Sequence, residues 1–537
     1  MADHFIGVDV GTGSVRAGVF DAAGTMLGVA KQDIRLWREA GDVVEQSSDD
    51  IWSAVCKTVR EAVAAAKVPA ASIAGLGFDA TCSLVVLGQD GKPMSAGPSG
   101  DAQRNVIVWM DHRATDQARR INASGEGVLR YVGGSISPEM ETPKLLWLAE
   151  KLPRTFADAW RFFDLADFLT WRSSGSMARS VCTVTCKWTY LAHERRWDET
   201  YFRTVGLGRL ADEGFERIGT EIVPAGTPLG AGLTAQAAAE LGLAEGTAVA
   251  AGLIDAHAGG IGTVGARGGP GDVLSRMAYV FGTSACTMTT TRDPAFVDGV
   301  WGPYFSAMVP GLWLNEGGQS AAGAALDHLV RMHPASPEAA ALASAQGIGL
   351  GAWLAGEAER RGGAPAIAAL VGRLIVVPEF LGNRAPFADP DARALIAGIG
   401  MDTGLDSLVG LYLAGVAGIG YGARQIVEAQ RAAGISTDTI VVSGGAGQNP
   451  LVRQVLADTT GLAVAASTSP EPVLLGSAIL ASVAAGSHAS VANAMTAMSE
   501  LGNVYLPDPQ LRHWHDRRFA AFEALQRVGR DTNAGGD

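Results

Sequence analysis

The 537-residue sequence predicts an α/β protein made of two lobes that face each other across a cleft. Strand-like apolar runs alternate with a helical segment in the first 90 residues, which is typical of a layered α/β architecture. An apolar run followed by a turn of glycine, threonine and serine occurs near residue 11 and again near residue 282. A chain of this length also exceeds what one hydrophobic core supports, so we place a boundary between two similar lobes near residue 250.

The first segment reads as a strand pair, a helix and a further strand. Residues 5–10 and 15–20 are apolar runs on either side of a glycine-containing turn, which predicts two strands joined tightly. Capping-type residues open the segment 47–67, whose apolar residues follow helical spacing. Residues 73–87 return to strand character.

The second half repeats these patterns with more glycine. Residues 242–272 begin as a buried strand and pass into a glycine-rich stretch, and residues 275–291 are again strand-like. The segment 439–467 predicts a strand, a glycine turn, a helix and a strand. Asn449 suits the helix cap, and Pro450 suits the first helical turn, where its missing N–H costs nothing.

Two long apolar windows and the two chain ends complete the predicted elements. Residues 408–423 and 472–486 are shorter than the roughly 20 residues that span a bilayer, and we expect them to be buried helices. The last residues, 529–537, are predicted to be disordered. The N-terminus carries no basic region followed by an apolar core, so we expect a cytoplasmic protein.

Composition narrows the class of partner. The chain has 42 basic and 55 acidic residues and a net charge of −13, which argues against nucleic acid or an anionic membrane as the main ligand. Five scattered cysteines favour free thiols in a reducing compartment over a disulfide framework. Cys182 and Cys186 form the one close pair in the sequence. Because no second Cys/His pair lies nearby along the chain, packing or site lining is favoured over zinc binding.

The two glycine turns suggest phosphate binding. Glycine lets the backbone approach a phosphate closely, and consecutive N–H groups in a turn form an anion cradle. Neither turn is a P-loop, and the first is not a dinucleotide fingerprint, because no helix follows it directly. Taken singly, each turn is more often a structural hairpin than a phosphate site.

Two aspartates are candidates for chemistry. Asp9 lies between two valines, where a buried carboxylate needs a compensating cation such as nucleotide-bound Mg²⁺; the alternative is a strand-end aspartate satisfied by turn amides. Asp255 follows an apolar run and precedes small residues, so it could accept a hydroxyl proton during phosphoryl transfer, or simply cap a helix. We interpret His257 as a neighbour of this site and not as a metal ligand.

Three polar islands interrupt apolar surroundings at residues 78–83, 109–113 and 315–320. Their acids, amides and tryptophan are the mixture that a polyhydroxylated ligand requires. Trp109 and Trp188 could stack on such a ligand or belong to the core.

With these motifs in order, the sequence resembles the FGGY family of carbohydrate kinases along nearly its whole length. Five separated motifs carry the resemblance: IGVDVGTGSVR (6–16), METPKLLWL (140–148), GLIDAHAGGIG (252–262), FGTSAC (281–286) and SGGAGQNPL (443–451). Within the family, three further segments are similar to the ribulokinase branch, most closely to D-ribulokinases: GFDATCSLVV (77–86), TCKWTY (185–190) and WLNEGGQSAAG (313–323).

The resemblance implies two actin-like, ribonuclease H-like lobes that close on a sugar and on ATP with Mg²⁺. Residues 1–250 would form the N-terminal, sugar-binding lobe, residues 251–510 the C-terminal, nucleotide-binding lobe, and residues 511–537 a tail. We also expect a homodimer, with no nucleic-acid or membrane partner.

The resemblance also implies a role for each matched residue. Asp255 would be the general base and Asp9 would help to hold Mg²⁺. The phosphates would be wrapped by Gly11, Thr12, Gly13, Ser14, Gly282, Thr283 and Ser284. The adenosine would lie near Gly444, Gly445 and Asn449. Besides Asp255, the pentulose would be held by Ala80, Thr81, Cys82, Ser83, Asp111, Lys187 and Glu316.

The expected reaction is ATP-dependent phosphorylation of D-ribulose to D-ribulose 5-phosphate. The loop Thr81-Cys82-Ser83 replaces the Gln-Met-His loop typical of xylulokinases and argues against D-xylulose. L-Ribulose and the pentitols ribitol and arabinitol stay open, while glycerol is disfavoured. A different class also stays open: an actin-like nucleotide-binding protein without sugar chemistry.

Overall fold

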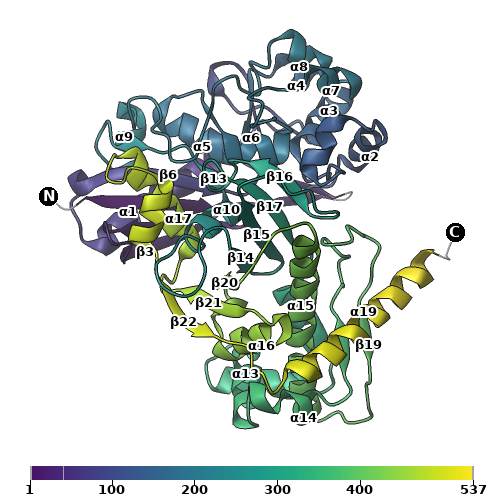
Figure 1. Ribbon diagram of the computed structural model, residues 1–537. Coiled ribbons are helices and arrows are strands. Elements are labelled where there is room, and N and C mark those ends of the chain that lie inside the picture. Colours follow the sequence, from purple (N-terminus) through teal and green to yellow (C-terminus); the bar gives the residue numbers. More distant parts are fainter. Residues whose placement is uncertain (1–2, 40–41, 535–537) are drawn as a thin grey trace.

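The computed structural model describes residues 3–39 and 42–534, and it has two lobes stacked one above the other (Figure 1). The first lobe is built on a six-stranded sheet in the order β12-β6-β1-β2-β3, with β13 also paired to β6. Its strands are β1 (His4–Val10), β2 (Ser14–Phe20), β3 (Met26–Asp33), β6 (Ile73–Ala80), β12 (Ala248–Val249) and β13 (Leu253–Ile254). The predicted strand pair at the N-terminus is therefore confirmed.

The strand register of this sheet gathers acidic residues at one edge. β1 and β6 are parallel, and their register places Asp9 directly beside Asp79. β13 is also parallel to β6, so Asp255, the next residue after β13, follows at the same edge. Because the carboxyl ends of parallel strands meet at one edge, three carboxylates converge at the turn between β1 and β2.

The second lobe repeats this plan in a seven-stranded sheet with the order β16-β17-β15-β14-β20-β21-β22. β14 and β15 form a hairpin around Gly282 to Ser284, and β14 runs parallel to β20, as β1 runs parallel to β6. The strands are β14 (Arg276–Phe281), β15 (Ala285–Thr291), β16 (Trp301–Phe305), β17 (Trp313–Gln319), β20 (Thr439–Ser443), β21 (Ala463–Ser467) and β22 (Leu501–Tyr505). The chain crosses from the first sheet to the second within residues 255–275.

One sequence-based expectation fails, and one alternative that the sequence left open is decided. The strand expected over residues 73–87 is two strands in different sheets, because residues 81–83 interrupt it after β6 and before β7 (Leu84–Leu87). The glycine-rich stretch after β13 begins as helix α10 (Asp255–Ile261), so Asp255 is the first residue of a helix. Both irregular points lie beside the interlobe site described below.

A five-stranded sheet, β4-β5-β8-β7-β9, and most of the shorter helices enlarge the first lobe. Its strands are β4 (Trp37–Glu39), β5 (Val43–Gln46), β7, β8 (Val106–Ile107) and β9 (Arg161–Asp164); β10 (Arg179–Ser180) and β11 (Ile222–Val223) form a separate pair. Its helices are α1 (Ser48–Ala66), α2 (Thr115–Ala123), α3 (Glu141–Lys151), α4 (Pro153–Asp158), α5 (Leu165–Ser174), α6 (Val181–Trp188), α7 (Glu199–Thr204), α8 (Gly208–Asp212) and α9 (Ala235–Leu241).

The second lobe is covered mainly by helices. They are α11 (Gly323–Arg331), α12 (Ser336–Ala345), α13 (Leu350–Arg360), α14 (Ile367–Val371), α15 (Leu405–Ala432), α16 (Pro450–Thr460) and α19 (Arg512–Ala534), with β18 (Ile375–Val377) and β19 (Leu395–Ala397) as a strand pair. Helix α18 (Val491–Met498) packs instead against α17 (Pro472–Ala484). Asn449 caps α16 by accepting from the N–H groups of Leu451 and Val452, as its position predicted.

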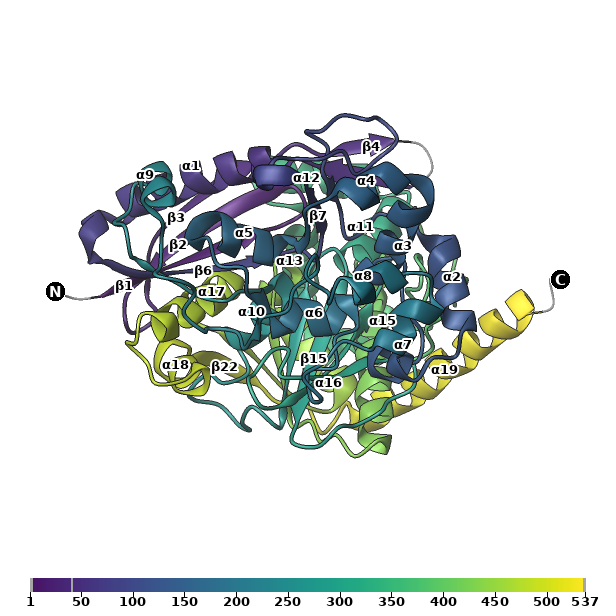
Figure 2. The ribbon, with the colours of Figure 1, turned by 90° about the horizontal axis from the view of Figure 1, so that it is seen from above.

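Helix α17 (Pro472–Ala484) returns from the second half of the chain to the first sheet, beside β1 and β6 (Figures 1 and 2). The approach is so close that a Cβ atom on Gly7 would lie 1.9 Å from the carbonyl oxygen of Leu474. A Cβ atom on Gly476 would lie 1.9 Å from the carbonyl oxygen of Ala258 in α10. Glycine is therefore required where this helix joins the two halves of the protein.

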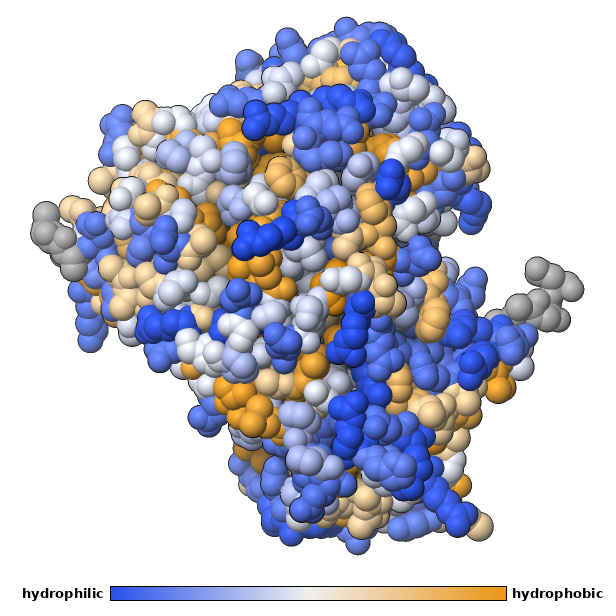
Figure 3. All heavy atoms as spheres, viewed as in Figure 1, coloured by the Kyte–Doolittle hydropathy of each residue, from blue (hydrophilic) through white to orange (hydrophobic). Residues whose placement is uncertain are grey.

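The two predicted apolar helices are confirmed, and the predicted tail is largely corrected. α15 is long and apolar enough to cross a membrane, but 78% of its apolar window is buried inside the protein. Figure 3 shows hydrophilic residues mixed with smaller hydrophobic patches on this face of the protein. The expected disorder at 529–537 is wrong up to Ala534, because α19 continues to that residue and packs Phe519 and Phe522 into the core of the second lobe. Residues 535–537 lie outside the described part.

Candidate functional site

Two cavities meet at the turn between β14 and β15. The interlobe cavity, of about 280 Å³, is lined by residues from both lobes, among them Asp9, Asp255 and Lys187. The second-lobe cavity, of about 660 Å³, is lined only by residues 282–452. Gly282 and Thr283 line both. A ligand in one cavity therefore lies next to a ligand in the other, with this turn between them.

Carboxylates form one wall of the interlobe cavity. The buried Asp9 carboxylate is paired with Arg16, which also binds Glu471 at 2.9 Å. Asp79 lies behind it and is fully buried; one of its oxygens accepts a hydrogen bond of 2.6 Å from Ser477. Its other oxygen has no hydrogen-bond partner among the described residues. Burial and the neighbouring Asp9 raise the pKa of Asp79 well above its usual range.

Asp255 reaches the interlobe cavity from its position between β13 and α10. Its side chain lines the cavity, and its Oδ1 accepts a 2.7 Å hydrogen bond from the N–H of Ala256. Burial, followed by the charge of Asp9, raises the pKa of Asp255 to about 6. A carboxylate with a pKa in this range is deprotonated at neutral pH, yet is a better proton acceptor than an ordinary aspartate.

We therefore expect an acid limb near pH 6 in the pH dependence of kcat/KM. Because the pKa of Asp255 is raised to about 6, the carboxylate takes up a proton as the pH falls through that value, and the general base that the family resemblance implies is lost. Below it, kcat/KM should fall about tenfold per pH unit. Initial rates between pH 4 and 9 at limiting sugar measure this; a limb near the ordinary value of 3.8 would contradict it.

A chain of buried charged groups leads away from the other wall. Glu316 on β17 lines the cavity, and its Oε2 lies 3.2 Å from His257 Nε2; His257 Nδ1 lies 3.0 Å from the Sγ of Cys182. Burial opposes ionisation of Glu316, but the charge of Lys187 and the hydrogen bond with His257 lower the pKa of Glu316 to about 2. Burial likewise opposes protonation of His257, but Cys182 and Glu316 raise the pKa of His257 to about 10. The contact with His257 thus fixes the position of the Glu316 carboxylate.

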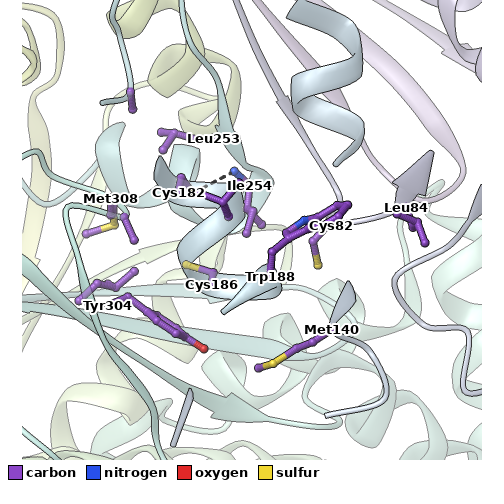
Figure 4. Packing of buried hydrophobic residues seen from close by; sticks show 14 of the residues in the cluster. Cys82, Leu84, Met140, Cys182, Cys186, Trp188, Leu253, Ile254, Tyr304 and Met308 are labelled. Atoms are coloured by element: carbon purple, nitrogen blue, oxygen red, sulfur yellow. Dashed lines mark hydrogen bonds between the residues drawn. The ribbon is translucent and has the colours of Figure 1, made fainter. Parts of the chain in front are cut away.

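The fold gives the Cys182–Cys186 pair a partner that spacing along the chain did not indicate. One ligand-type atom each of Cys182, Cys186 and His257 lies within 4.8 Å of the other two, although His257 is far from the pair along the chain. Figure 4 shows both thiols on α6 packed among apolar residues, with the N–H of Ile254 donating to Cys182 over 3.4 Å. Cys182, Cys186 and His257 are buried, and none of them lines either cavity. They therefore support Glu316 from the side away from the interlobe cavity.

Most of the residues expected from sequence come together here. The interlobe cavity is lined by Asp9, Gly11, Thr12, Thr81, Cys82, Lys187, Asp255, Gly282, Thr283, Ser284 and Glu316. Gly445 and Asn449 line the second-lobe cavity, with Gly282 and Thr283. The two lobes thus contribute the residues expected for a sugar and for a nucleotide to adjoining spaces.

Six expected residues lie outside both linings: Ala80, Ser83, Asp111, Gly13, Ser14 and Gly444. The Asp111 carboxylate is instead occupied by Arg113, at 2.7 Å, and by the N–H of Val44, at 2.6 Å. Gly444 has a φ of +88°, and a Cβ there would lie 2.5 Å from the carbonyl oxygen of Phe281, so it serves the turn after β20. Ser83 supports the site from behind by accepting from the N–H of Trp109.

Sequence reasoning also missed residues that line the interlobe cavity: Arg16, Glu139, Trp301 and Arg384. Arg16 belongs to the quoted first motif, but its ion pair with Asp9 follows from the strand register. Arg384 lies in the loop between β18 and β19, where no sequence pattern pointed to it. Of the two tryptophans, Trp188 is core, whereas Trp109 lines the cavity and donates to the Thr12 hydroxyl at 2.9 Å.

Comparison with known proteins identifies the family that shares this arrangement. Residues 4–262 match the N-terminal domain, and residues 277–485 the C-terminal domain, of the FGGY family of carbohydrate kinases. A human FGGY carbohydrate kinase domain-containing protein is 46% identical over 532 residues, which cover 97% of this chain and 96% of that protein. A D-ribulokinase of Saccharomyces cerevisiae is 37% identical over 515 residues, covering 90% of this chain and 72% of that protein.

A solved structure shows the same fold. The crystal structure of xylulose kinase from Rhodospirillum rubrum has a TM-score of 0.78, with 22% sequence identity and 98% of each chain covered. At this identity the likeness establishes the actin-like, two-lobed fold and nothing about the substrate.

Proposed function

Because the chain belongs to the FGGY family of carbohydrate kinases, we propose that it phosphorylates a pentulose with ATP, converting D-ribulose to D-ribulose 5-phosphate. The observation that carries the proposal is the shared wall of the two cavities. Gly282 and Thr283 face both spaces, so a triphosphate held in the second lobe would present its last phosphoryl group to an alcohol beside Asp255.

In the proposed transfer, one O–P bond forms, one O–P bond breaks and one proton moves. The terminal hydroxyl oxygen of the sugar bonds to the γ-phosphorus while the bond from that phosphorus to the β,γ-bridging oxygen breaks, and ADP leaves with the electron pair. Asp255 accepts the hydroxyl proton. The N–H groups of the turns that contain Gly11 and Gly282 would stabilise the charge on the phosphoryl oxygens.

The cavity wall also suits Mg²⁺, which prefers carboxylate oxygens and water. Asp9 and Asp255 both line the cavity, and the oxygen of Asp79 without a hydrogen-bond partner lies behind them. Asp9 would hold the ion, which, when bound, neutralises charge on the phosphates. The compensating cation in the structure is Arg16, so metal binding would compete with the Arg16–Asp9 pair.

The choice of D-ribulose rests on sequence similarity and on the sugar end of the cavity. The S. cerevisiae relative is named a D-ribulokinase. Thr81 and Cys82 line the cavity in place of the bulkier loop typical of xylulokinases, and Lys187 and Glu316 offer a donor and an acceptor for hydroxyl groups. L-Ribulose and pentitols are the alternatives that this site leaves open.

A panel of acceptors tests the proposal. ADP release, measured with a coupled assay, should be fastest with D-ribulose and lower with L-ribulose, ribitol, D-arabinitol, D-xylulose and glycerol, because a site built to hydrogen-bond its substrate rejects analogues by up to about 10⁴–10⁵. A pentitol that matched D-ribulose would transfer the assignment to a polyol kinase. Absence of ADP release with every acceptor would contradict the proposed function.

The compartment and the assembly state stay predictions. All five cysteines are free thiols, which supports a reducing compartment such as the cytoplasm. The expected homodimer can be tested by light scattering on the purified chain.

A further inference from the structure

Arg384 is a cation in the interlobe cavity that forms no ion pair with any carboxylate in the described part of the chain. It lies in the loop between β18 and β19 and lines the cavity from the second lobe. Among the described residues, its nearest polar contact is the Cys286 sulfur, 3.6 Å from Nη1, and its guanidinium carbon lies 5.6 Å from the centre of the Trp301 ring. No carboxylate oxygen in the described chain comes within ion-pairing distance of it.

The carboxylates nearest to this cation already have other partners. Glu139 lies 3.5 Å from His112, and Glu316 lies 3.2 Å from His257. Arg384 is half-buried, and the charges of Glu139 and Glu316 act on it without forming an ion pair. A partly desolvated guanidinium is stabilised further by an anion that accepts its hydrogen bonds. The geometry therefore leaves the fork of Arg384 available for an incoming anion.

The position of Arg384 indicates which anion it would bind. A neutral pentulose offers hydroxyl groups and no charge, whereas the proposed reaction brings a phosphoryl group into this cavity. Cys286, which Arg384 contacts, lies two residues after Ser284 and so directly beside the turn shared by the two cavities. Arginine also matches phosphate better than lysine does, because its planar fork binds two oxygens at once.

The other cations of the cavity are placed for different tasks. Arg16 is paired with both Asp9 and Glu471. Lys187 belongs to the first lobe, on α6, and its ammonium lies 4.6 Å from the centre of the Trp301 ring. Arg384 comes from the second lobe, which also carries the turn Gly282 to Ser284.

We propose that Arg384 is a catalytic residue that donates hydrogen bonds to the oxygens of the phosphoryl group as it passes from ATP to the sugar hydroxyl. This inference rests on the proposed function. The bonds made and broken are those given above: the new O–P bond forms, ADP leaves with the electron pair, and Asp255 takes the proton. Arg384 supplies charge to the group in transit and takes no proton.

The test compares Arg384→Gln and Arg384→Lys with Arg393→Gln. Arg393 lies in the same loop, is exposed and donates to the backbone carbonyls of Pro390 and Ala392, so it controls for disturbance of the loop. We expect Arg384→Gln to lower kcat by about 10²–10³, as loss of a donor to a developing oxyanion does, with sugar and ADP affinities within about threefold of wild type. The kcat of Arg384→Lys should lie between those of Arg384→Gln and wild type, and the kcat of Arg393→Gln should match that of wild type.

A second measurement, of the melting temperature, does not depend on turnover. ADP with aluminium fluoride and the sugar mimics the phosphoryl group in transit, and the rise in melting temperature that it causes in wild type should be lost in Arg384→Gln. If that variant instead loses sugar affinity at unchanged kcat, or keeps both kcat and the fluoride-dependent stabilisation, the inference is overturned. If wild type itself releases no ADP with any acceptor, the proposed function fails first, which is a distinct outcome.

Discussion

Replacing Asp255 by asparagine is expected to lower kcat by about 10²–10⁴ while sugar affinity stays nearly unchanged. The amide fills the same space and can still accept the hydrogen bond from the N–H of Ala256, so α10 should begin as before. What it cannot do is accept the hydroxyl proton. Steady-state kinetics with ATP and the best acceptor measure kcat, and calorimetric titration with the sugar measures affinity.

The control for this variant is Asp212→Asn, at the exposed end of α8, where the aspartate pairs with Arg203 on the surface. It should behave as wild type in both measurements, since exposed ion pairs contribute little. Undiminished turnover in Asp255→Asn would remove this residue from the role of proton acceptor. A large loss of sugar affinity would instead assign it to substrate binding.

Replacing Gly476 by alanine is expected to destabilise the protein and to lower its activity together. The added methyl group would lie 1.9 Å from the carbonyl oxygen of Ala258, so α17 and α10 must move apart. Overpacking of this kind costs about 1–3 kcal/mol of unfolding free energy. Because α10 begins with Asp255, its displacement should also reduce kcat. Urea unfolding followed by circular dichroism and a parallel rate measurement test both effects.

Gly356→Ala is the matched control for this substitution. Gly356 lies in α13, where a Cβ atom would approach only the flexible end of Arg360, at 4.0 Å. The same chemical change should therefore be neutral or stabilise by up to about 1 kcal/mol, since alanine favours helix over glycine. Equal behaviour of the two variants would show that the close approach of α17 to α10 is not what the glycine permits.

Local patterns were enough to predict many elements of the fold. The hairpin around Gly11 to Ser14, the buried helices α15 and α17, and the capped helix α16 each follow from periodicity, turn chemistry or capping within a few residues. The residues with the clearest local signals, Asp9 and Asp255, indeed lie in one cavity. Local patterns failed where an element ends early, as at residues 81–83, or continues through polar sequence, as in α19.

Contacts between residues that are far apart in the sequence could not be predicted from such local patterns. Asp79 could have been suspected, because it ends a strand as Asp9 does, but only the parallel register of β1 and β6 makes the two carboxylates neighbours. Nothing in the segment around Arg384 marks it as part of the site, because the loop reaches the cavity through the packing of the second lobe. The Cys182–His257–Glu316 chain likewise joins three separate elements.

The amino-acid sequence by itself determined the α/β class, the repeated strand–turn–strand plan, the membership of a sugar kinase family and the proton-accepting candidate Asp255, because each depends on residues adjacent in the chain. Tertiary structure alone decided which charges face one another: Asp9 with Asp79 and Arg16, Glu316 with His257, and Arg384 with no carboxylate at ion-pairing distance among the described residues. The reason is physical. The energy of a buried charge depends on its distance to every other charge and to water, and those distances exist only once the two lobes have packed.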